Sequence, residues 1–166
     1  MTLQSILDDL NSFPIFGGIL PDDLAKMEDL FISGDYAEGD HMIDEGTKGD
    51  RLYIIVSGTA EVTANLEGQK ILQLATLKRG ETFGEMELID TQDRSATVIA
   101  LEPTTTLELT NMKFFKLFQR NPEAFRIIMM NLARDLSRRL RAADQRIVRF
   151  IETGELPPGR NIGTEM

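Results

Sequence analysis

The residues with the clearest chemical potential lie in the stretch 83–98, FGEMELIDTQDRSATV. Gly84 is followed directly by a carboxylate, Glu85, and nine residues after that by a guanidinium, Arg94. We expect a glycine turn, one short helical turn, a polar loop and then a new strand. Backbone N–H groups at a helix start favour an anion, and a guanidinium binds phosphate through two parallel hydrogen bonds. The pattern therefore predicts a site for a ligand that carries both a phosphate and a hydroxyl group.

Short strands are expected to position this stretch. From about residue 33 to residue 110, apolar residues alternate with polar ones between glycine turns, and the run 52–56, LYIIV, is apolar enough to be covered on both faces. About seven or eight short strands at this spacing are typical of an antiparallel sandwich or barrel. Residues 3–12 and a segment that begins at Pro21 have helical periodicity.

Helices are also expected after the strands. We expect Asn111 to cap a short helix. Asn121 and Pro122 suit the cap and first turn of a second helix, which continues without a breaker to about Ile151.

The stretch FGEMEL, followed by a loop and RSAT, closely resembles the phosphate-binding cassette of cyclic nucleotide-binding domains, as found in catabolite activator proteins and protein kinase regulatory subunits. The resemblance extends over about residues 20–150 and includes Gly39, Glu45-Gly46 and Gly58 at family-like places. It implies a mainly β fold with flanking helices: an antiparallel jelly-roll β-barrel with N-terminal helices and a long C-terminal helix. The expected division is an N-terminal helical segment at 1–32, the barrel at 33–110, the C-terminal helices at 111–151 and a flexible tail at 152–166.

The resemblance also implies roles for individual residues. Arg94 would bind the phosphate, together with Ser95 and the amides after Gly84, and Glu85 would accept a hydrogen bond from the ribose 2′-hydroxyl. The cassette residues expected at the ligand are Phe83, Gly84, Glu85, Met86, Glu87, Arg94, Ser95 and Ala96. Outside the cassette, Val62 and Leu74 would wall the pocket, and Ala143 and Asp144 on the long helix would cover the base.

Two acids depart from the family pattern. Glu87 stands where a small residue is usual, and Asp93 stands where proline is frequent. A carboxylate that faces a phosphate near a solvated surface opposes binding by about 1 kcal/mol. These acids leave three hypotheses: a cyclic purine nucleotide sensor, a degenerate domain that binds no nucleotide and acts as a dimeric scaffold, or a site for another anion such as a cyclic dinucleotide. We favour the sensor, with cAMP rather than cGMP as ligand, because cGMP binders often carry threonine where Ser95 stands.

The long helix is expected to have two roles. Its first half would pack on the barrel, and its second half would pair with a second copy of the chain to form a homodimer. The apolar positions that step by three or four along it are Phe125, Ile128, Met129, Leu132, Leu136, Leu140, Ala143, Ile147 and Phe150. The arginines at 134, 138, 139, 141, 146 and 149 are expected to form a solvated face. Ligand binding would move this helix and so signal to an effector protein that the sequence does not identify.

Composition excludes several other classes of protein. The chain has 166 residues and no cysteine, and its single histidine, His41, cannot build a metal cluster or a catalytic relay. No apolar run is long enough for a membrane span, and no phosphate-binding loop of the nucleotide triphosphatase type is present. We therefore expect a cytoplasmic protein that is not an enzyme, has no metal or cofactor and does not contact a membrane.

Charge is distributed unevenly along the chain. Residues 1–111 hold 7 Lys/Arg and 21 Asp/Glu, whereas residues 112–166 hold 11 and 6. The acidic part would repel nucleic acid. The few residues after Ile151 are also too few for a helix-turn-helix, so we expect no DNA binding.

Overall fold

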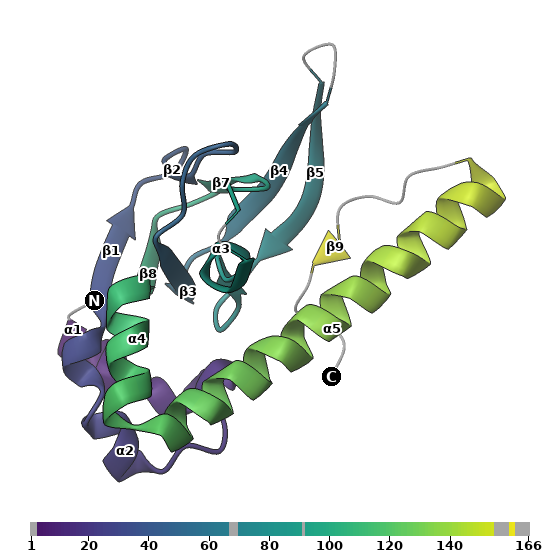
Figure 1. The fold of residues 1–166 in the computed structure, drawn as a ribbon. Helices are drawn as coiled ribbons and strands as arrows, with labels where there is room; N and C mark the ends of the chain where they lie inside the picture. The colour runs from purple at the N-terminus through teal and green to yellow at the C-terminus, as the bar shows by residue number, and fades with distance from the viewer. Residues whose placement is uncertain (1–2, 67–69, 91, 155–159, 162–166) are drawn as a thin grey trace.

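The structure is a computed structural model that describes residues 3–66, 70–90, 92–154 and 160–161. Strands form a barrel from two sheets, short helices gather at one end of it, and one long helix runs outward from that end (Figure 1).

Antiparallel pairing connects nearly all the strands. The first sheet has the order β1-β8-β3-β6, with β1 (Ile32–Tyr36), β8 (Thr104–Thr110), β3 (Arg51–Ser57) and β6 (Thr82–Phe83). The second has the order β2-β7-β4-β5-β9, with β2 (His41–Ile43), β7 (Thr97–Ala100), β4 (Ala60–Leu66), β5 (Lys70–Leu77) and β9 (Arg160–Asn161). Only β9 pairs in parallel among these strands, with β5. The predicted antiparallel jelly-roll barrel with N-terminal helices and a long C-terminal helix is confirmed.

Strand β3 is buried on both faces, as its apolar run predicts. On one face Tyr53 and Ile55 join a cluster between the two sheets that also contains Phe83. On the other face Leu52 and Ile54 join a cluster built largely from the helices. Because side chains alternate along a strand, this single strand connects the barrel interior to the helical layer.

The N-terminal segment is less regular than its periodicity predicts. It contains α1 (Leu3–Leu7), the 3₁₀ turns η1 (Leu10–Ser12) and η2 (Pro14–Phe16), α2 (Pro21–Ala25) and the 3₁₀ turn η3 (Glu28–Leu30). Short helices are marginal on their own and take the shape that packing gives them. Here Ile6, Leu10, Phe13 and Phe16 are all buried in the cluster against β3 and β8.

The two C-terminal helices begin at polar caps. The cap of α4 (Asn111–Arg120) is Thr110, whose hydroxyl accepts from the Lys113 amide at 3.3 Å, so the prediction that Asn111 is the cap is wrong by one residue. The cap of α5 (Pro122–Thr153) is Asn121, whose side chain accepts from Ala124, as predicted.

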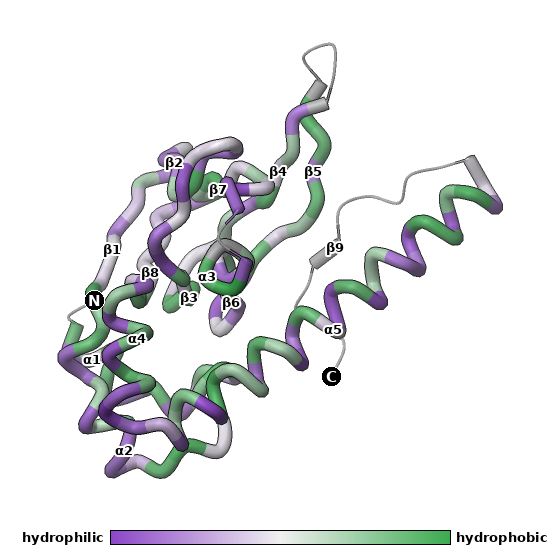
Figure 2. The backbone as a smooth tube through the Cα atoms, viewed as in Figure 1, coloured by the Kyte–Doolittle hydropathy of each residue, from purple (hydrophilic) through white to green (hydrophobic). Residues whose placement is uncertain are grey.

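Helix α5 has two different halves. Ala124, Ile128 and Leu132 of its first half are buried in the core. The second half extends away from the helical end of the molecule, and apolar and polar residues alternate along it (Figure 2). The large apolar side chains exposed there are Leu140, Ile147, Val148, Phe150 and Ile151.

The ends of the predicted segments fall as follows. Strand β1 begins at Ile32 and β8 ends at Thr110, and the division into four segments stays a prediction. Of the predicted tail at 152–166, residues 155–159 and 162–166 lie outside the described residues, and Arg160–Asn161 pair with β5. Among the described helices, none has the length and apolar character that crossing a membrane requires.

Candidate functional site

A glycine turn joins β6 to α3 (Met86–Asp90). Gly84 has φ +73°, and a Cβ atom there would lie 2.7 Å from the Nη1 atom of Arg94 and 2.9 Å from the carbonyl oxygen of Arg51. Both the backbone conformation and the lack of space require glycine. The turn therefore brings the start of α3 and the guanidinium of Arg94 together, as the sequence predicts.

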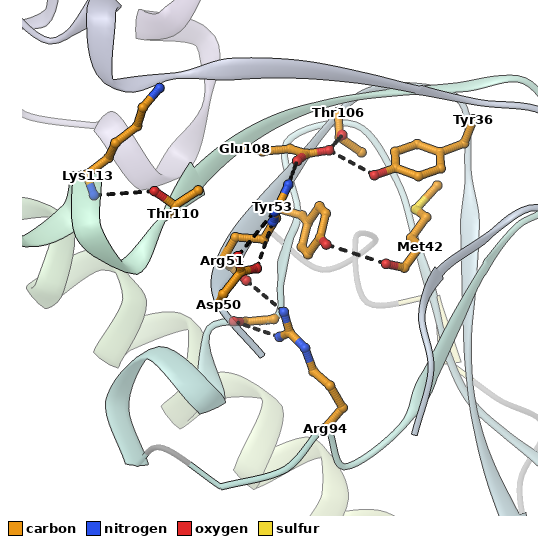
Figure 3. Close-up of polar contacts among 11 residues, drawn as sticks. Tyr36, Met42, Asp50, Arg51, Tyr53, Arg94, Thr106, Glu108, Thr110 and Lys113 are labelled. Carbon is orange, nitrogen blue, oxygen red and sulfur yellow. Dashed lines mark hydrogen bonds and ion pairs between the residues drawn. The ribbon is translucent and has the colours of Figure 1, made fainter. Parts of the chain in front are cut away.

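Arg94 is folded inward against the main chain. Its side chain is 5% exposed, Nη1 donates to the Gly84 carbonyl at 3.2 Å and Nη2 donates to the Arg51 carbonyl at 3.0 Å (Figure 3). The guanidinium carbon lies 5.9 Å from the centre of the Tyr53 ring, within the range of a cation–π contact. The group expected to bind phosphate thus has a well-defined resting position on carbonyl groups.

The loop before β3 fixes the backbone of Arg94. The Arg94 amide donates to the Thr47 carbonyl, and the Gly46 amide donates to the Arg94 carbonyl, both at 2.8 Å. Lys48 forms an ion pair with Asp93 in the same place. The negative charge of Asp93, which departs from the family pattern, is therefore balanced by a neighbouring lysine.

Glu85 is buried and holds the long helix. The residue is 3% exposed, and Oε1 accepts from Nη1 of Arg139 at 3.1 Å. The other terminal nitrogen of Arg139 donates to the Thr82 carbonyl at 2.5 Å and pairs with Asp135 at 2.7 Å. One arginine of α5 thus binds both the carboxylate of the cassette and the strand that precedes it.

The other predicted cassette residues differ in their surroundings. Phe83 is buried and stacks on Tyr53, with ring centroids 4.7 Å apart. Ser95 and Met86 are exposed and touch, the Ser95 hydroxyl lying 3.9 Å from the Met86 sulfur, while Ala96 is half-buried. The side chain of Glu87 lies outside the described part of the structure.

The residues predicted to wall and cover the pocket lie on the second sheet and on α5. Val62 and Leu74 are half-buried on neighbouring strands, and the Leu74 carbonyl accepts from Nη1 of Arg146 at 2.8 Å. Ala143 and Asp144 are exposed.

Arg139 and Arg146 reach the barrel from α5, so for these two the prediction of a solvated arginine face is wrong. They are seven residues apart and so lie on one side of the helix. That spacing is the signal that could have indicated their role.

Within the described ranges, no group of three or more His, Asp or Glu side chains is arranged to hold a metal ion. Around the cassette turn, Arg94 donates to the Gly84 carbonyl and Arg139 pairs with Glu85, so a carboxylate and two guanidinium groups are available to an anionic, hydroxyl-bearing ligand.

The fold and this cassette define a class of protein. A family model described as the cyclic nucleotide-binding domain matches residues 34–121, and the chain belongs to that family.

Several known proteins are similar to it. The cyclic AMP receptor protein of Thermus thermophilus is 35% identical over 131 residues, which are 79% of this chain and 59% of that protein. The cGMP-dependent protein kinase egl-4 of Caenorhabditis briggsae is 32% identical over 69% of this chain and 16% of the kinase. A cyclic nucleotide-binding domain from Methylobacillus flagellatus has a structure that matches with a TM-score of 0.77 and 25% identity, over 88% of this chain and 82% of that one.

The chain spans 59% of the length of the Thermus receptor and 16% of the kinase. The similarities therefore concern one domain of these proteins, the cyclic nucleotide-binding regulatory domain.

Proposed function

We propose that this domain is a sensor that binds a cyclic purine nucleotide at the cassette 83–96, with cAMP preferred over cGMP. The observation that carries the proposal is that Arg94 rests on the Gly84 carbonyl, directly before Glu85, and that both residues are buried and hydrogen-bonded in a chain of this family. The acid would accept from the ribose hydroxyl, and the guanidinium would pair with the phosphate.

The remaining roles follow the predicted residues. Ser95 is exposed beside Met86 at the mouth of the cassette, where its hydroxyl could donate to a phosphate oxygen. Val62 and Leu74 would wall the pocket, and Ala143 and Asp144 would cover the base after a movement of α5. The preference for cAMP rests on Ser95 rather than on the similar proteins, because these include both a cyclic AMP receptor and a cGMP-dependent kinase.

Signalling would proceed through α5. Arg139 binds Glu85, and Arg146 binds the Leu74 carbonyl, so two predicted ligand-contacting residues also hold this helix. A ligand shifts an equilibrium only when it binds one arrangement better than the other. A ribose hydroxyl that shares Glu85 with Arg139 meets this condition, since it competes for the carboxylate that holds the helix.

The domain would form a homodimer and would signal to an effector protein. The exposed apolar side chains of the second half of α5 provide a surface that a second copy could cover. We expect the sensor to act in the cytoplasm and without catalytic activity of its own, since the cassette offers groups that suit binding.

Calorimetric titration with cAMP and cGMP tests the proposal, after a denatured sample has been checked for co-purified nucleotide. We expect submillimolar binding that Arg94→Ala weakens at least about ten-fold, because a hydrogen bond to a charged group contributes roughly 1.5–3 kcal/mol. Arg138→Ala is the matched control, since that side chain is 68% exposed and pairs only with Asp135 among the described residues.

Each alternative has its own result. Unchanged affinity in Arg94→Ala would place the site elsewhere. No heat with either nucleotide, and none co-purified, would support the scaffold hypothesis. Binding of a cyclic dinucleotide that depends on Arg94, without binding of cAMP, would identify a different anion.

A further inference from the structure

Arg51 lies between two acids beside the cassette. Its Nη1 atom donates to Oε2 of Glu108 at 2.9 Å, and its Nε atom donates to Oδ1 of Asp50 at 2.8 Å (Figure 3). The Glu108 side chain is 4% exposed, whereas that of Arg51 is 31% exposed. The carboxylate of this ion pair is therefore buried, whereas the guanidinium is partly exposed to solvent.

Glu108 is also fixed from its other side. Oε1 accepts from the Tyr36 hydroxyl at 2.8 Å and from the Thr106 hydroxyl at 3.1 Å. Space for this arrangement comes from Gly34 on β1, where a Cβ atom would lie 2.2 Å from Oε1. Every oxygen of the carboxylate thus has a hydrogen bond, as a stable buried charge requires.

The backbone of the same two residues holds both the cassette and a helix. The Arg51 carbonyl accepts from Nη2 of Arg94 at 3.0 Å, and the Asp50 carbonyl accepts from the amide of Asn111, the first residue of α4, at 2.7 Å. Tyr53 lies among these groups, and the charges of Asp50, Arg51, Arg94 and Glu108 all act on its hydroxyl, whose pKa is raised chiefly by burial. Arg94 therefore rests on the main chain of the residue whose side chain pairs with Glu108.

We propose that the Arg51–Glu108 ion pair sets the resting position of Arg94, and through it the affinity of the cassette for phosphate. The part that concerns affinity rests on the proposed function, and the part that concerns the resting position does not. While Glu108 balances the charge of Arg51, the guanidinium of Arg94 can lie on the Arg51 carbonyl. Phosphate binding requires Arg94 to leave that carbonyl, so the stability of the resting position lowers the apparent affinity.

Two substitutions are expected to act in opposite directions. Glu108→Gln keeps the size of the side chain but removes the buried counter-charge of Arg51. The exposed carboxylate of Asp50 then balances Arg51 less well, so Arg51 repels Arg94 from its resting position. Arg51→Gln keeps a donor for Glu108 but leaves a buried negative charge, which attracts Arg94 inward. Arg51 and Glu108 are therefore positioning residues, since neither is expected to touch the ligand.

The first experiment needs no nucleotide. Guanidinium signals of Arg94 are identified by nitrogen NMR as those missing in Arg94→Ala, and their hydrogen exchange is measured in the free protein. We expect exchange to be about ten-fold faster in Glu108→Gln and slower in Arg51→Gln, since opening of the resting position sets its rate. Glu102→Gln, which removes an exposed acid, should leave it unchanged. If Glu108→Gln does not fold, Arg51→Gln tests the resting position by itself, and unchanged exchange of Arg94 in that variant would overturn it.

The second experiment is a double-mutant cycle on cAMP affinity. We expect Glu108→Gln to tighten binding by about three- to ten-fold and Arg51→Gln to weaken it, with both effects absent in the Arg94→Ala background. A merely structural role would change affinity equally in both backgrounds and would overturn the proposal. Unchanged exchange of Arg94 in Glu108→Gln would also overturn it, whatever the nucleotide result. If Arg94 exchanges faster in Glu108→Gln but the protein binds no nucleotide, the role of the ion pair in the resting position is supported and only the proposed function is rejected.

Discussion

Arg139 on the long helix and Glu85 in the cassette turn form an ion pair of 3.1 Å across 54 residues of sequence. Their side chains are only 21% and 4% exposed, so the pair is shielded from water. A carboxylate that is expected to bind the ligand therefore also determines where α5 lies. Ligand binding and the position of α5 are therefore both expected to depend on the carboxylate of Glu85.

Replacing Arg139 with alanine should loosen the second half of α5. The change leaves the carboxylate of Glu85 without this cation and removes the hydrogen bond to the Thr82 carbonyl. We expect the free energy of unfolding to fall by roughly 1–3 kcal/mol, the cost of leaving a buried polar group unsatisfied. Hydrogen exchange measured along α5 should become faster beyond residue 135 and change little before it.

Arg138→Ala is the control for this change, because the Arg138 side chain is next to Arg139 in the sequence but is 68% exposed and makes an i,i+3 pair with Asp135. Exposed pairs of this kind contribute about 0.2–1 kcal/mol or less. Equal effects of the two substitutions would show that the contact with Glu85 does not hold the helix.

Gly84 and Gly46 offer a matched test of the cassette turn. Both have positive φ, +73° and +80°, but only at Gly84 would a Cβ atom meet the Arg94 and Arg51 groups, whereas nothing lies within 4 Å at Gly46. Gly46→Ala should cost about 1–2 kcal/mol for the left-handed backbone alone. Gly84→Ala should cost more and should also abolish nucleotide binding, as measured by urea unfolding and calorimetry. Similar losses at both positions would mean that space around Arg94 is not limiting.

Much of the fold could be predicted because local signals agree with it. Period-two alternation, glycine turns and the cap formed by Asn121 specify strands and the start of α5, and the structure has them there. The N-terminal helices were predicted too long, because periodicity does not show that packing of Leu10 and Phe13 breaks them into shorter turns.

The site could be predicted only in part, because some of its bonds join distant segments through groups that carry no local pattern. The order of Gly84, Glu85 and Arg94 identified the cassette. Nothing in that order shows that Arg94 rests on the carbonyl of Arg51, since main-chain acceptors are common to all residues. The contact of Arg139 with Glu85 was missed for a related reason: an arginine on a helix is usually solvated, and only the tertiary fold shows which one turns inward.

Asp50 should make stability depend on acid pH. Hydrogen bonding to Arg51 holds its pKa below the ordinary value of 3.8. A group whose folded pKa is lowered contributes stability above its unfolded pKa and loses it as the pH falls through the folded value. Because the carboxylate is 67% exposed, the contribution should be below about 1 kcal/mol.

Asp50→Asn checks this dependence. Urea unfolding of both proteins from pH 7 to pH 2 should give a small stability advantage to the native aspartate that closes below pH 3.8. A gap that stays constant over this range would mean that the ion pair with Arg51 does not favour the folded state.

Substitution of the exposed apolar face of α5 should separate a dimer into monomers. Leu140 and Ile147 are seven residues apart and 63% and 58% exposed, so they lie on one exposed side of the helix. Burying each such side chain contributes about 1.5–3 kcal/mol, and a symmetric dimer buries both in each copy. Leu140→Glu with Ile147→Glu should therefore weaken association by at least about 100-fold, since each 1.4 kcal/mol is tenfold. Sedimentation equilibrium measures this, with Arg138→Glu and Gln145→Glu, also seven apart and exposed, as the control. A native protein that is monomeric at all concentrations, or a double variant that still dimerises, would contradict pairing through this face.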